Sequence, residues 1–398
     1  MHALPLTGLV ALSLLAGTAT ASAQTFNDAP PNGEGQTPAF EGQTRAPYLA
    51  DDVSVKRETI ANGLQNPWGM DQLPDRRWIV TERPGRMRII DTDGNKSHAI
   101  DGLPEVDARG QGGLLDVVVK DDFAQTRRVW WSFAEPRGDG LNGTAVATGI
   151  LSDDDSRMEH VEVILQQNPA WRSTNHYGSR LVFDPSGALF VTTGERYYTE
   201  SRQLAQDVGT HLGKVLRIDP MGGPAEGNPD LAGGLPEVWS YGHRNIQSAA
   251  LGPDGHLWTV EHGPKGGDEL NRPKAGKNYG WPIISYGENY SGTPVGEGIT
   301  AKGGMEQPVY YWDPVIAPAG MVFYDGAMFP SFKGDALIGG LASKALVRLK
   351  LEDGKVVGEA RYLEGRSRVR DVDVDAKDGA IMLLTDANNG ALMRVTPE

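Results

Sequence analysis

Short apolar runs separated by tight polar turns recur along most of the chain, from about Val53 to its end. The clearest examples are GMDQLPDRRWIVTE near Asp75, LVFDPSGALFVTTGE near Asp184, AALGPDGHLWTVEHG near Asp254 and VDVDAKDGAIMLLTD near Asp378. Turns of Asp, Pro and Gly between β-rich runs favour a β-hairpin, because glycine readily adopts a positive φ. The pattern therefore predicts a series of antiparallel strand pairs.

Weaker versions of the same hairpin occur near Asp121 and Asp335, so we expect six hairpins in all. They are spaced by roughly 45 to 80 residues, and the chain has hardly any stretch with a helical period. Repetition on this scale is typical of propeller blades. We therefore expect an all-β fold, a six-bladed β-propeller of four-stranded antiparallel blades with long loops on its top face. An unrelated pair of β-sandwiches is the alternative.

The beginning of the chain differs from the rest. Leu4 to Ala21 is apolar and small and ends in Ala21-Ser22-Ala23, which is typical of a signal peptide cleaved after Ala23. A membrane anchor or a buried helix is the alternative interpretation of this run. The following segment is rich in Pro, Gly, Gln and Asn, which predicts a flexible leader. We expect a signal peptide over 1–23, the leader over 24–50 and a single propeller domain over 51–398, in a periplasmic or secreted protein.

Composition and charge exclude several classes of function. The formal net charge of -14 argues against a nucleic-acid partner and against docking on anionic lipid, since both need a basic surface. The chain has no cysteine, which excludes disulfides, thiolate catalysis and cysteine-ligated metals. No run beyond the beginning of the chain is apolar enough to cross a bilayer, so we expect no membrane insertion.

Histidine is scarce, with eight residues, so its placement is informative. His176 precedes Tyr177 and Gly178 in a connection just before the third hairpin. A histidine in such a loop suits a general base, because its ordinary pKa lies near neutrality. A purely structural turn residue is the alternative.

Two groups of polar residues suit an anionic ligand. Arg244, Asn245 and Gln247 bring one cation and two amides close together, and guanidinium groups bind carboxylates bidentately. The segment 366–370 reads RSRVR, so its three arginines share one face if the segment is extended. A polar strand end and a solvated edge are the respective alternatives.

The segment from Glu261 to Tyr279 is rich in glycine and in exposed carbonyl groups, and it contains Asp268 and Glu269. Calcium prefers several oxygen ligands, including backbone carbonyls, which irregular glycine-rich loops can supply. The segment does not match an EF-hand, so a solvated loop is the alternative to a calcium site.

Six motifs follow one another along the chain: GQGGLLDVVV from Gly110, HYGSRLVF from His176, HLGKVLRIDP from His211, YGHRNIQS from Tyr241, EHGPKGGDELNRPKAGKNYGWP from Glu261 and RVRDVDV from Arg368. Together they resemble the soluble aldose sugar dehydrogenases that depend on pyrroloquinoline quinone (PQQ), relatives of soluble glucose dehydrogenase. The resemblance runs from about Gln65 to Arg394. It implies a propeller with PQQ across its top face, Ca²⁺, and oxidation of aldoses at C1 to the lactone. We also expect an external electron acceptor, a quinone or a cytochrome, and a monomer or a homodimer, although the sequence selects neither an acceptor nor an oligomeric state.

The resemblance assigns roles to particular positions. His176 matches the general base that takes the proton of the anomeric hydroxyl, Glu195 matches its acidic partner, and Arg244 matches a cation near the reactive quinone carbonyls. The implied cofactor contacts are Gln111, Arg244, Asn245, Gln247, Lys344, Arg368 and Arg370. The implied metal ligands are the carbonyls of Gly263 and Pro264 for an active-site calcium, and Glu269 and Tyr279 for a second, structural calcium.

Three positions depart from the family pattern. Ala342 stands where the family often has a lysine, with Lys344 two residues further on; Val315 replaces a residue with a hydroxyl group; and Glu195 replaces an aspartate. These departures bear on cofactor affinity. Two other classes of protein stay open: a propeller that binds carbohydrate or protein without catalysis, and a calcium-dependent lactonase, which would not need the arginines.

Overall fold

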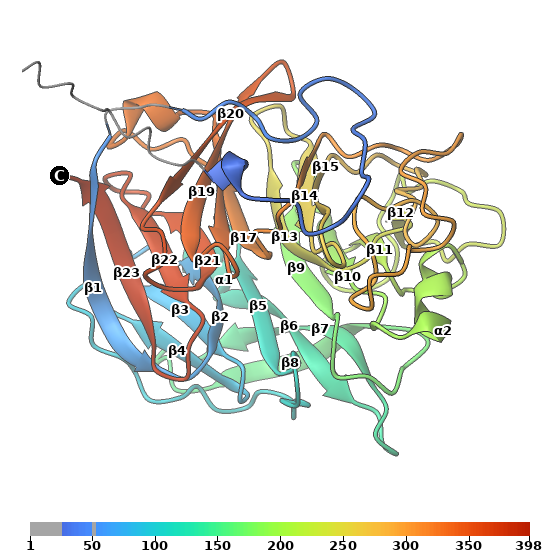
Figure 1. Cartoon of the computed structure of the whole chain (residues 1–398). Helices are drawn as coiled ribbons and strands as arrows, with labels where there is room; N and C mark the ends of the chain where they lie inside the picture. The colour runs from blue at the N-terminus through green and yellow to red at the C-terminus, as the bar shows by residue number, and fades with distance from the viewer. Residues whose placement is uncertain (1–25, 50–52) are drawn as a thin grey trace, which may run out of the picture.

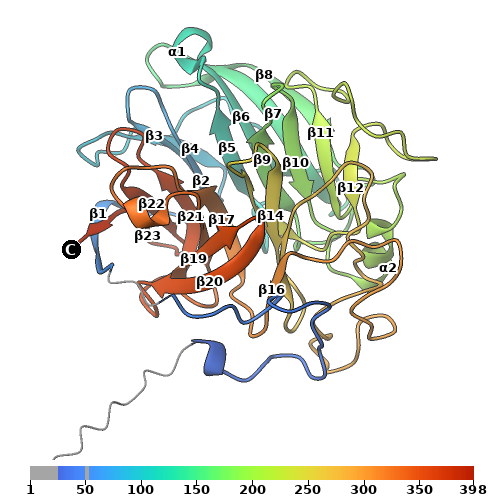
Figure 2. The ribbon, with the colours of Figure 1, turned by 90° about the horizontal axis from the view of Figure 1, so that it is seen from above.

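The computed structural model describes residues 26–49 and 53–398 (Figure 1). The predicted signal peptide, 1–23, lies outside the described residues. The regular elements are almost all β-strands, arranged as six antiparallel sheets around a central axis (Figure 2). The two α-helices in the described ranges, α1 (Phe123–Thr126) and α2 (Thr199–Arg202), have four residues each. The predicted all-β, six-bladed propeller is therefore confirmed.

The blades follow one another along the chain. Blade 1 consists of β2 (Pro67–Gln72), β3 (Trp78–Glu82) and β4 (Arg86–Ile90). Blade 2 consists of β5 (Leu114–Val119), β6 (Arg128–Pro136), β7 (Asn142–Leu151) and β8 (Met158–Gln166). Blade 3 consists of β9 (Gly178–Phe183), β10 (Leu189–Thr193), β11 (Lys214–Ile218) and β12 (Val238–Tyr241).

The second half of the ring is built in the same way. Blade 4 consists of β13 (Ile246–Leu251), β14 (Leu257–Glu261), β15 (Asp268–Asn271) and β16 (Tyr310–Trp312). Blade 5 consists of β17 (Pro318–Phe323), β18 (Ala336–Gly340), β19 (Ala345–Glu352) and β20 (Lys355–Tyr362). Blade 6 consists of β21 (Val369–Val374), β22 (Ile381–Thr385), β23 (Gly390–Pro397) and β1 (Val55–Leu64). Five sheets thus have the four strands that the sequence predicted, and blade 1 has three in the described residues.

Each predicted hairpin is the turn between the first and second strands of a blade. In the turn between β9 and β10, Asp184 Oδ1 accepts the backbone N–H of Ser186 at 2.8 Å and of Ala188 at 3.0 Å. Gly187 in the same turn has a φ of 90°, which glycine adopts without strain. The first strands lie side by side around the axis, and the residues at the beginning of each are buried. We call the end where these strands begin the top of the propeller.

The first and last strands of the chain pair with each other and close the ring. Strand β1 pairs antiparallel with β23, with Val55 opposite Pro397 and Leu64 opposite Gly390. The N-terminal strand is therefore the outermost strand of the last blade, which joins the first and last parts of the propeller through backbone hydrogen bonds.

A buried arginine joins several blades at the axis. Arg180 on β9 donates through Nη1 to Asp116 Oδ1 of β5 and to Asp371 Oδ1 of β21, both at 2.9 Å. Its Nε donates to the carbonyl of Gln247 on β13 at 2.9 Å, and its guanidinium lies 4.3 Å from the ring of Trp68 on β2. One cation thus connects five blades beneath the top face.

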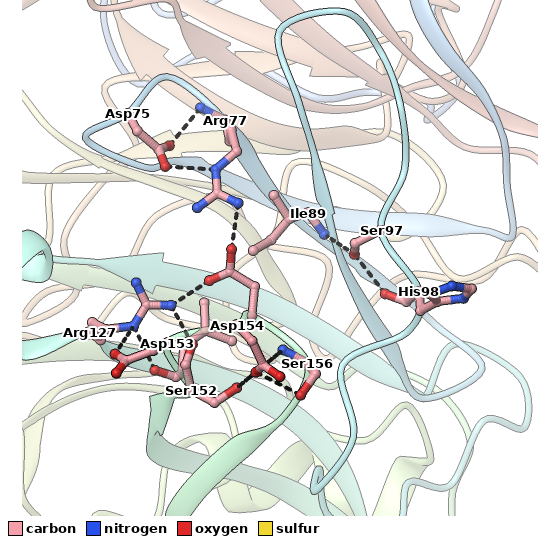
Figure 3. A network of polar contacts seen from close by, with 12 residues as sticks. Asp75, Arg77, Ile89, Ser97, His98, Arg127, Ser152, Asp153, Asp154 and Ser156 are labelled. Carbon is pink, nitrogen blue, oxygen red and sulfur yellow. Dashed lines mark hydrogen bonds and ion pairs between the residues drawn. The ribbon is translucent and has the colours of Figure 1, made fainter.

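A second polar cluster joins blades 1 and 2 at the bottom face, away from the predicted site. Arg77 pairs with Asp75 at 2.7 Å and with Asp155 at 2.5 Å, and Arg127 also pairs with Asp155 (Figure 3). These residues lie beside an open polar cavity of about 470 Å³. None of the predicted site residues lines this cavity, so we assign the cluster to the connection between blades.

The described part of the predicted leader is packed against the propeller. This N-terminal strap (residues 26–49) runs along the outer edge of the ring beside β16 and β20 (Figure 2). Gln43 is fully buried, donates to the carbonyl of Pro308 at 3.0 Å and accepts the backbone N–H of Tyr311 at 2.8 Å. The sequence predicted a flexible leader because the segment has few apolar residues, whereas polar bonds attach it. Within the described ranges, no helix is long and apolar enough to span a membrane.

Candidate functional site

His176 lies in the loop before β9, at the top of the propeller. Its φ of 52° turns the backbone sharply, and its backbone N–H donates to Gln111 Oε1 at 2.8 Å. The buried imidazole places Nδ1 3.1 Å from Glu195 Oε2. The structure therefore brings together three residues that the sequence assigned to one site.

Glu195, just after β10, is fully buried. Its Oε2 also accepts the backbone N–H of Tyr197, whereas its Oε1 is buried without a hydrogen-bond partner among the described residues. Burial raises the pKa of Glu195, but the interactions with His176, Arg244 and the backbone N–H of Tyr197 outweigh this and hold that pKa below its usual value. A carboxylate that stays ionised accepts the Nδ1 hydrogen of a neutral imidazole, which leaves Nε2 as the proton acceptor.

The loop after Glu195 holds an aromatic ring against this histidine. Arg196 and Tyr197 both have positive φ, 71° and 81°, which is unusual for residues with side chains. The Arg196 guanidinium lies 3.7 Å from the ring of Tyr177 and donates to Asn142 Oδ1 at 2.6 Å. Tyr197 then contacts His176 edge-to-face, with ring centroids 5.2 Å apart. These contacts limit the orientations open to the imidazole.

Arg244 lies in the connection between β12 and β13 and joins the same site. Its carbonyl accepts the backbone N–H of Glu195 at 2.9 Å. Nη1 donates to the carbonyls of His262 at 2.9 Å and Gly263 at 2.7 Å. Nε and Nη2 are buried and have no partner among the described residues, so two charged donors are available to a ligand.

A cavity of about 210 Å³ opens at the top of the axis. It brings together residues of five blades and of the loops above them: Trp68, Arg83, Gln111, Asn245, Gln247, His262, Ala317, Leu341, Arg368, Arg370 and Asp386. Gln247 Oε1 accepts Arg370 Nη1 at 3.0 Å across this cavity, and Asn245 Oδ1 accepts the backbone N–H of Gly178 at 3.1 Å. Five of the predicted cofactor contacts therefore surround one space.

Positive charge exceeds negative charge on the cavity wall. Arg368 Nε and Arg370 Nη2 pair with Asp386 at 2.8 Å and 3.4 Å, and Arg83 donates to the carbonyl of Gly112 at 2.9 Å. Burial lowers the pKa of Arg370, and the neighbouring arginines lower it further, although the charge of Asp386 acts in the opposite direction. The Nε atom of Arg370 has no hydrogen-bond partner in the described part of the chain. Three guanidinium groups with one carboxylate, in a protein with a net charge of -14, suit an anionic ligand.

His262 was not predicted, although it lies beside Gly263 and Pro264. Its Nε2 lies 2.6 Å from the carbonyl of Pro318 and donates to it. Burial, together with nearby cations, lowers the pKa of His262 to about 3, so this ring is neutral and structural at ordinary pH.

Lys344 lies in the turn between β18 and β19 and is exposed, as is Ala342. Leu341 of this turn lines the cavity, whereas Lys344 does not. The predicted contact between Lys344 and the cofactor therefore stays a prediction. At Val315, the second departure from the family pattern, the backbone N–H donates to Asn32 Oδ1 at 2.8 Å.

The four predicted metal ligands lie around a second, much smaller cavity. Its volume is about 10 Å³, and it is lined by Gly263, Pro264, Glu269 and Tyr279 together with Arg244, Glu261, His262, Gly267, Trp281, Ile284 and Ser285. A space of this size holds about one water-sized species. No group of three His, Cys, Asp or Glu side chains suited to a metal occurs in 26–49 or 53–398, so backbone oxygens would have to contribute.

Two carboxylates meet beside this smaller cavity. Asn271 Nδ2 donates to Glu261 Oε1 at 3.1 Å and to Glu269 Oε2 at 3.3 Å, so one amide bridges both. The Tyr279 hydroxyl donates elsewhere, to the carbonyl of Arg272 at 2.7 Å. Two neighbouring carboxylates, Glu261 buried and Glu269 half-buried, fit a hard cation together with backbone carbonyls. Glu261, which the sequence analysis did not assign, joins the candidate ligands.

A family model described as Glucose / Sorbosone dehydrogenase matches residues 64–394. This chain belongs to the glucose/sorbosone dehydrogenase family. An aldose sugar dehydrogenase of Escherichia coli K12 is 42% identical to it over 357 residues, which cover 87% of this chain and 94% of that protein. The chain is thus an oxidoreductase that acts on sugars, and the predicted family and enzyme class are confirmed.

Solved structures of sugar dehydrogenases have the same architecture. A glucose dehydrogenase superposes with a TM-score of 0.83 at 46% identity, covering 86% of this chain and 100% of that one. The PQQ-bound form of an aldose sugar dehydrogenase from Streptomyces coelicolor has a TM-score of 0.71 at 27% identity, covering 87% and 100% of the two chains. In this sugar dehydrogenase, sequence reasoning missed the ionisable wall residues Arg83, Asp386 and His262 and the apolar wall residues Trp68, Ala317 and Leu341. No local motif surrounds Arg83 or Asp386.

Proposed function

We propose that this sugar dehydrogenase oxidises aldoses at C1 to the lactone with PQQ and Ca²⁺, and that His176 is its general base. The observation that carries the proposal is the oriented pair of His176 and Glu195, which is joined through Gln111 and Arg244 to a cavity lined by arginines. The PQQ-bound relative supports the choice of cofactor.

The residues fit a planar tricarboxylate. Arg83, Arg368 and Arg370 supply the positive charge that carboxylates need, and Arg370 Nε is a buried donor without a partner in the described residues. Arg244 offers two further unpartnered donors, which suit carbonyl oxygens. When bound, PQQ supplies the two-electron acceptor for the sugar, and calcium supplies a Lewis acid beside it.

His176 removes the proton from the anomeric hydroxyl. Its Nδ1–H donates to Glu195, so Nε2 carries the lone pair that accepts this proton. The ionised Glu195 then stabilises the imidazolium, and the edge of Tyr197 keeps the ring in place. Gln111 fixes the His176 backbone, so the base is oriented before the sugar arrives.

Calcium would be held by the loop between β14 and β15. Gly263, Pro264, Glu261 and Glu269 line the smaller cavity, and the carbonyls of the first two and the carboxylates of the last two are the candidate ligands. Arg244 donates to the Gly263 carbonyl, so the metal loop and the cofactor contact are coupled through one hydrogen bond of 2.7 Å.

The proposal includes an external electron acceptor, a quinone or a cytochrome, and export of the chain through the segment 1–23. The test uses the mature protein from Gln24, with glucose, PQQ, Ca²⁺ and a redox dye. Dye reduction that requires sugar, PQQ and Ca²⁺ together supports the proposal. Absence of PQQ binding by calorimetry in the presence of Ca²⁺ would contradict it.

The pH dependence of turnover is expected to reflect His176. Burial lowers the pKa of His176 below its ordinary value of 6.5. The charge of Glu195 acts in the opposite direction, and the charge of Arg244 lowers the pKa further. Because the base must be neutral, kcat should stay on its plateau at pH 6.5 and fall only as the pH drops through this lowered pKa. The measurement is kcat from pH 4 to 8 at saturating PQQ. A half-maximal rate at or above pH 6.5 would assign the base to another group.

Replacing Glu269 by Gln is expected to weaken stabilisation by calcium. A ligand that binds only the folded state raises Tm, by an amount that grows with its concentration relative to Kd. The wild-type Tm should rise when Ca²⁺ replaces EDTA, and the rise should be smaller in Glu269→Gln. Glu162→Gln, an exposed change on β8, is the matched control. Equal calcium-dependent shifts in the three proteins would remove Glu269 from the site.

A further inference from the structure

The N-terminal strap is fixed to blade 5 at both of its ends. Near its beginning, the ring of Phe26 lies 4.0 Å from the guanidinium carbon of Arg361 on β20. At its end, the backbone N–H of Leu49 donates to the carbonyl of Glu359 at 2.9 Å. The residues between these anchors leave blade 5 and return to it, so the middle of the strap reaches another part of the protein.

The tip of the strap binds the connection between blades 4 and 5. The backbone N–H groups of Asn32 and Gly33 donate to the two carboxylate oxygens of Asp313, the latter at 3.2 Å. In return, Asn32 Oδ1 accepts the backbone N–H of Val315 at 2.8 Å. Arg45 adds a bond from Nη2 to the Asp313 carbonyl at 2.8 Å. The strap therefore binds both the side chain and the backbone of the segment 313–315.

The segment 313–317 continues from the strap to the ligand cavity. Ala317 lines the cavity, and its carbonyl accepts the backbone N–H of Leu341, a second wall residue, at 2.9 Å. The backbone N–H groups of Ile316 and Ala317 donate to Asp268 Oδ2 at 2.9 Å and 2.7 Å. A shift of this segment would therefore move one wall of the cavity and the side chain of Asp268.

Asp268 links the segment 313–317 to Arg244 through Gly263. Its Oδ1 accepts the backbone N–H of Gly263 at 2.9 Å, and the Gly263 carbonyl accepts Arg244 Nη1 at 2.7 Å. The side chain of Asp268 is buried, so it has no water with which to exchange these bonds. Hydrogen bonds and the backbone of 313–316 thus connect Asn32 through Asp313 and Asp268 to Arg244.

We propose that the N-terminal strap positions the wall of the ligand cavity at Ala317 and the neighbouring Gly263–Arg244 hydrogen bond, and thereby sets the affinity for PQQ without touching the cofactor. This inference rests on the proposed function. The strap residues Phe26 to Glu41 are mostly exposed, and no large apolar side chain among them is buried. Their bonds at the tip consequently contribute to the geometry of the site more than to the core.

Asn32→Ala in the full mature chain tests the inference, since it removes the bond to Val315. A single hydrogen bond of this kind alters an equilibrium by roughly 3- to 10-fold, so we expect the Kd for PQQ, measured by calorimetry with Ca²⁺, to rise by that factor. Deletion of residues 24–41 should raise it further, while Gln43 and Ala46 stay in place. Addition of a peptide of residues 26–41 to the deleted protein should lower the Kd again.

Glu41→Ala, at an exposed strap position, is the matched control and should leave the Kd unchanged. An unchanged Kd in both Asn32→Ala and the deletion, with normal binding by the wild type, would overturn the inference. So would a loss of affinity that parallels a fall in the Tm of the protein without PQQ, because the strap would then act on the whole fold. A wild-type protein that binds no PQQ would instead contradict the proposed function.

Discussion

Replacing His176 by Asn is expected to lower kcat by about 10²- to 10⁴-fold, the range typical of a lost general base. Asparagine tolerates the positive φ of this position better than most residues, so the loop should keep its shape. Its amide is able to donate to Glu195 but unable to accept the proton of the anomeric hydroxyl. The loss should therefore appear in kcat.

The measurement combines steady-state rates with calorimetry of PQQ binding. Because His176 does not line the larger cavity, the Kd for PQQ should change little. His98→Gln, in a polar loop at the bottom cavity, is the control and should retain full activity. A variant at His176 with unchanged kcat would show that another group takes the proton.

Replacing Arg180 by Met is expected to lower the free energy of unfolding by about 3–5 kcal/mol at neutral pH, the cost typical of breaking a buried ion pair. Methionine fills much of the same volume but leaves Asp116 and Asp371 buried without their cation. The measurement is denaturant unfolding of the protein without cofactor. Arg57→Met, an exposed change on β1, should cost far less.

The loss in the free energy of unfolding caused by Arg180→Met should become larger as the pH rises. Burial already raises the pKa of Asp116 to about 6 against the attraction of Arg180, and loss of that cation raises it further. A carboxyl group whose pKa is higher in the folded state stabilises the fold when protonated, and this contribution is lost as the pH rises through the folded pKa. The difference from wild type should therefore be larger at pH 8 than at pH 5. Adding Asp116→Asn should restore part of the stability, and a deficit that is constant with pH would argue against unpaired carboxylates.

The number and type of blades could be predicted because the first hairpin of each blade carries a local turn signal. The turns at Asp184 and Asp254 are strong examples, since their Asp and Gly residues are needed by the turn itself. The outer strands have no such signal. The pairing of β1 with β23 depends on contacts between distant parts of the chain. No local signal distinguishes blade 1, which has three strands in the described residues, from the four-stranded blades.

Some site residues also have a local sequence signal, whereas others come together only through contacts between distant parts of the chain. His176, Glu195 and Arg244 lie in ordered motifs, and the structure brings them together as expected. Arg83 and Asp386 come from blades 1 and 6 and meet only when the ring closes. The strap was predicted to be flexible because its sequence is rich in Pro, Gly, Gln and Asn and has few bulky apolar residues. Its attachment uses polar bonds, which leave no apolar period in the sequence.

The pairing of β1 with β23 also bears on how the protein folds and how long it stays folded. Its contacts join Val55 to Pro397, so the final blade cannot form until nearly the whole chain is available. Such non-local pairing slows folding, because a long loop must close before the contact stabilises it. The same closure removes the free end from which a linear repeat protein frays. We expect a protein that folds slowly, resists local opening and persists mainly through a high barrier to unfolding.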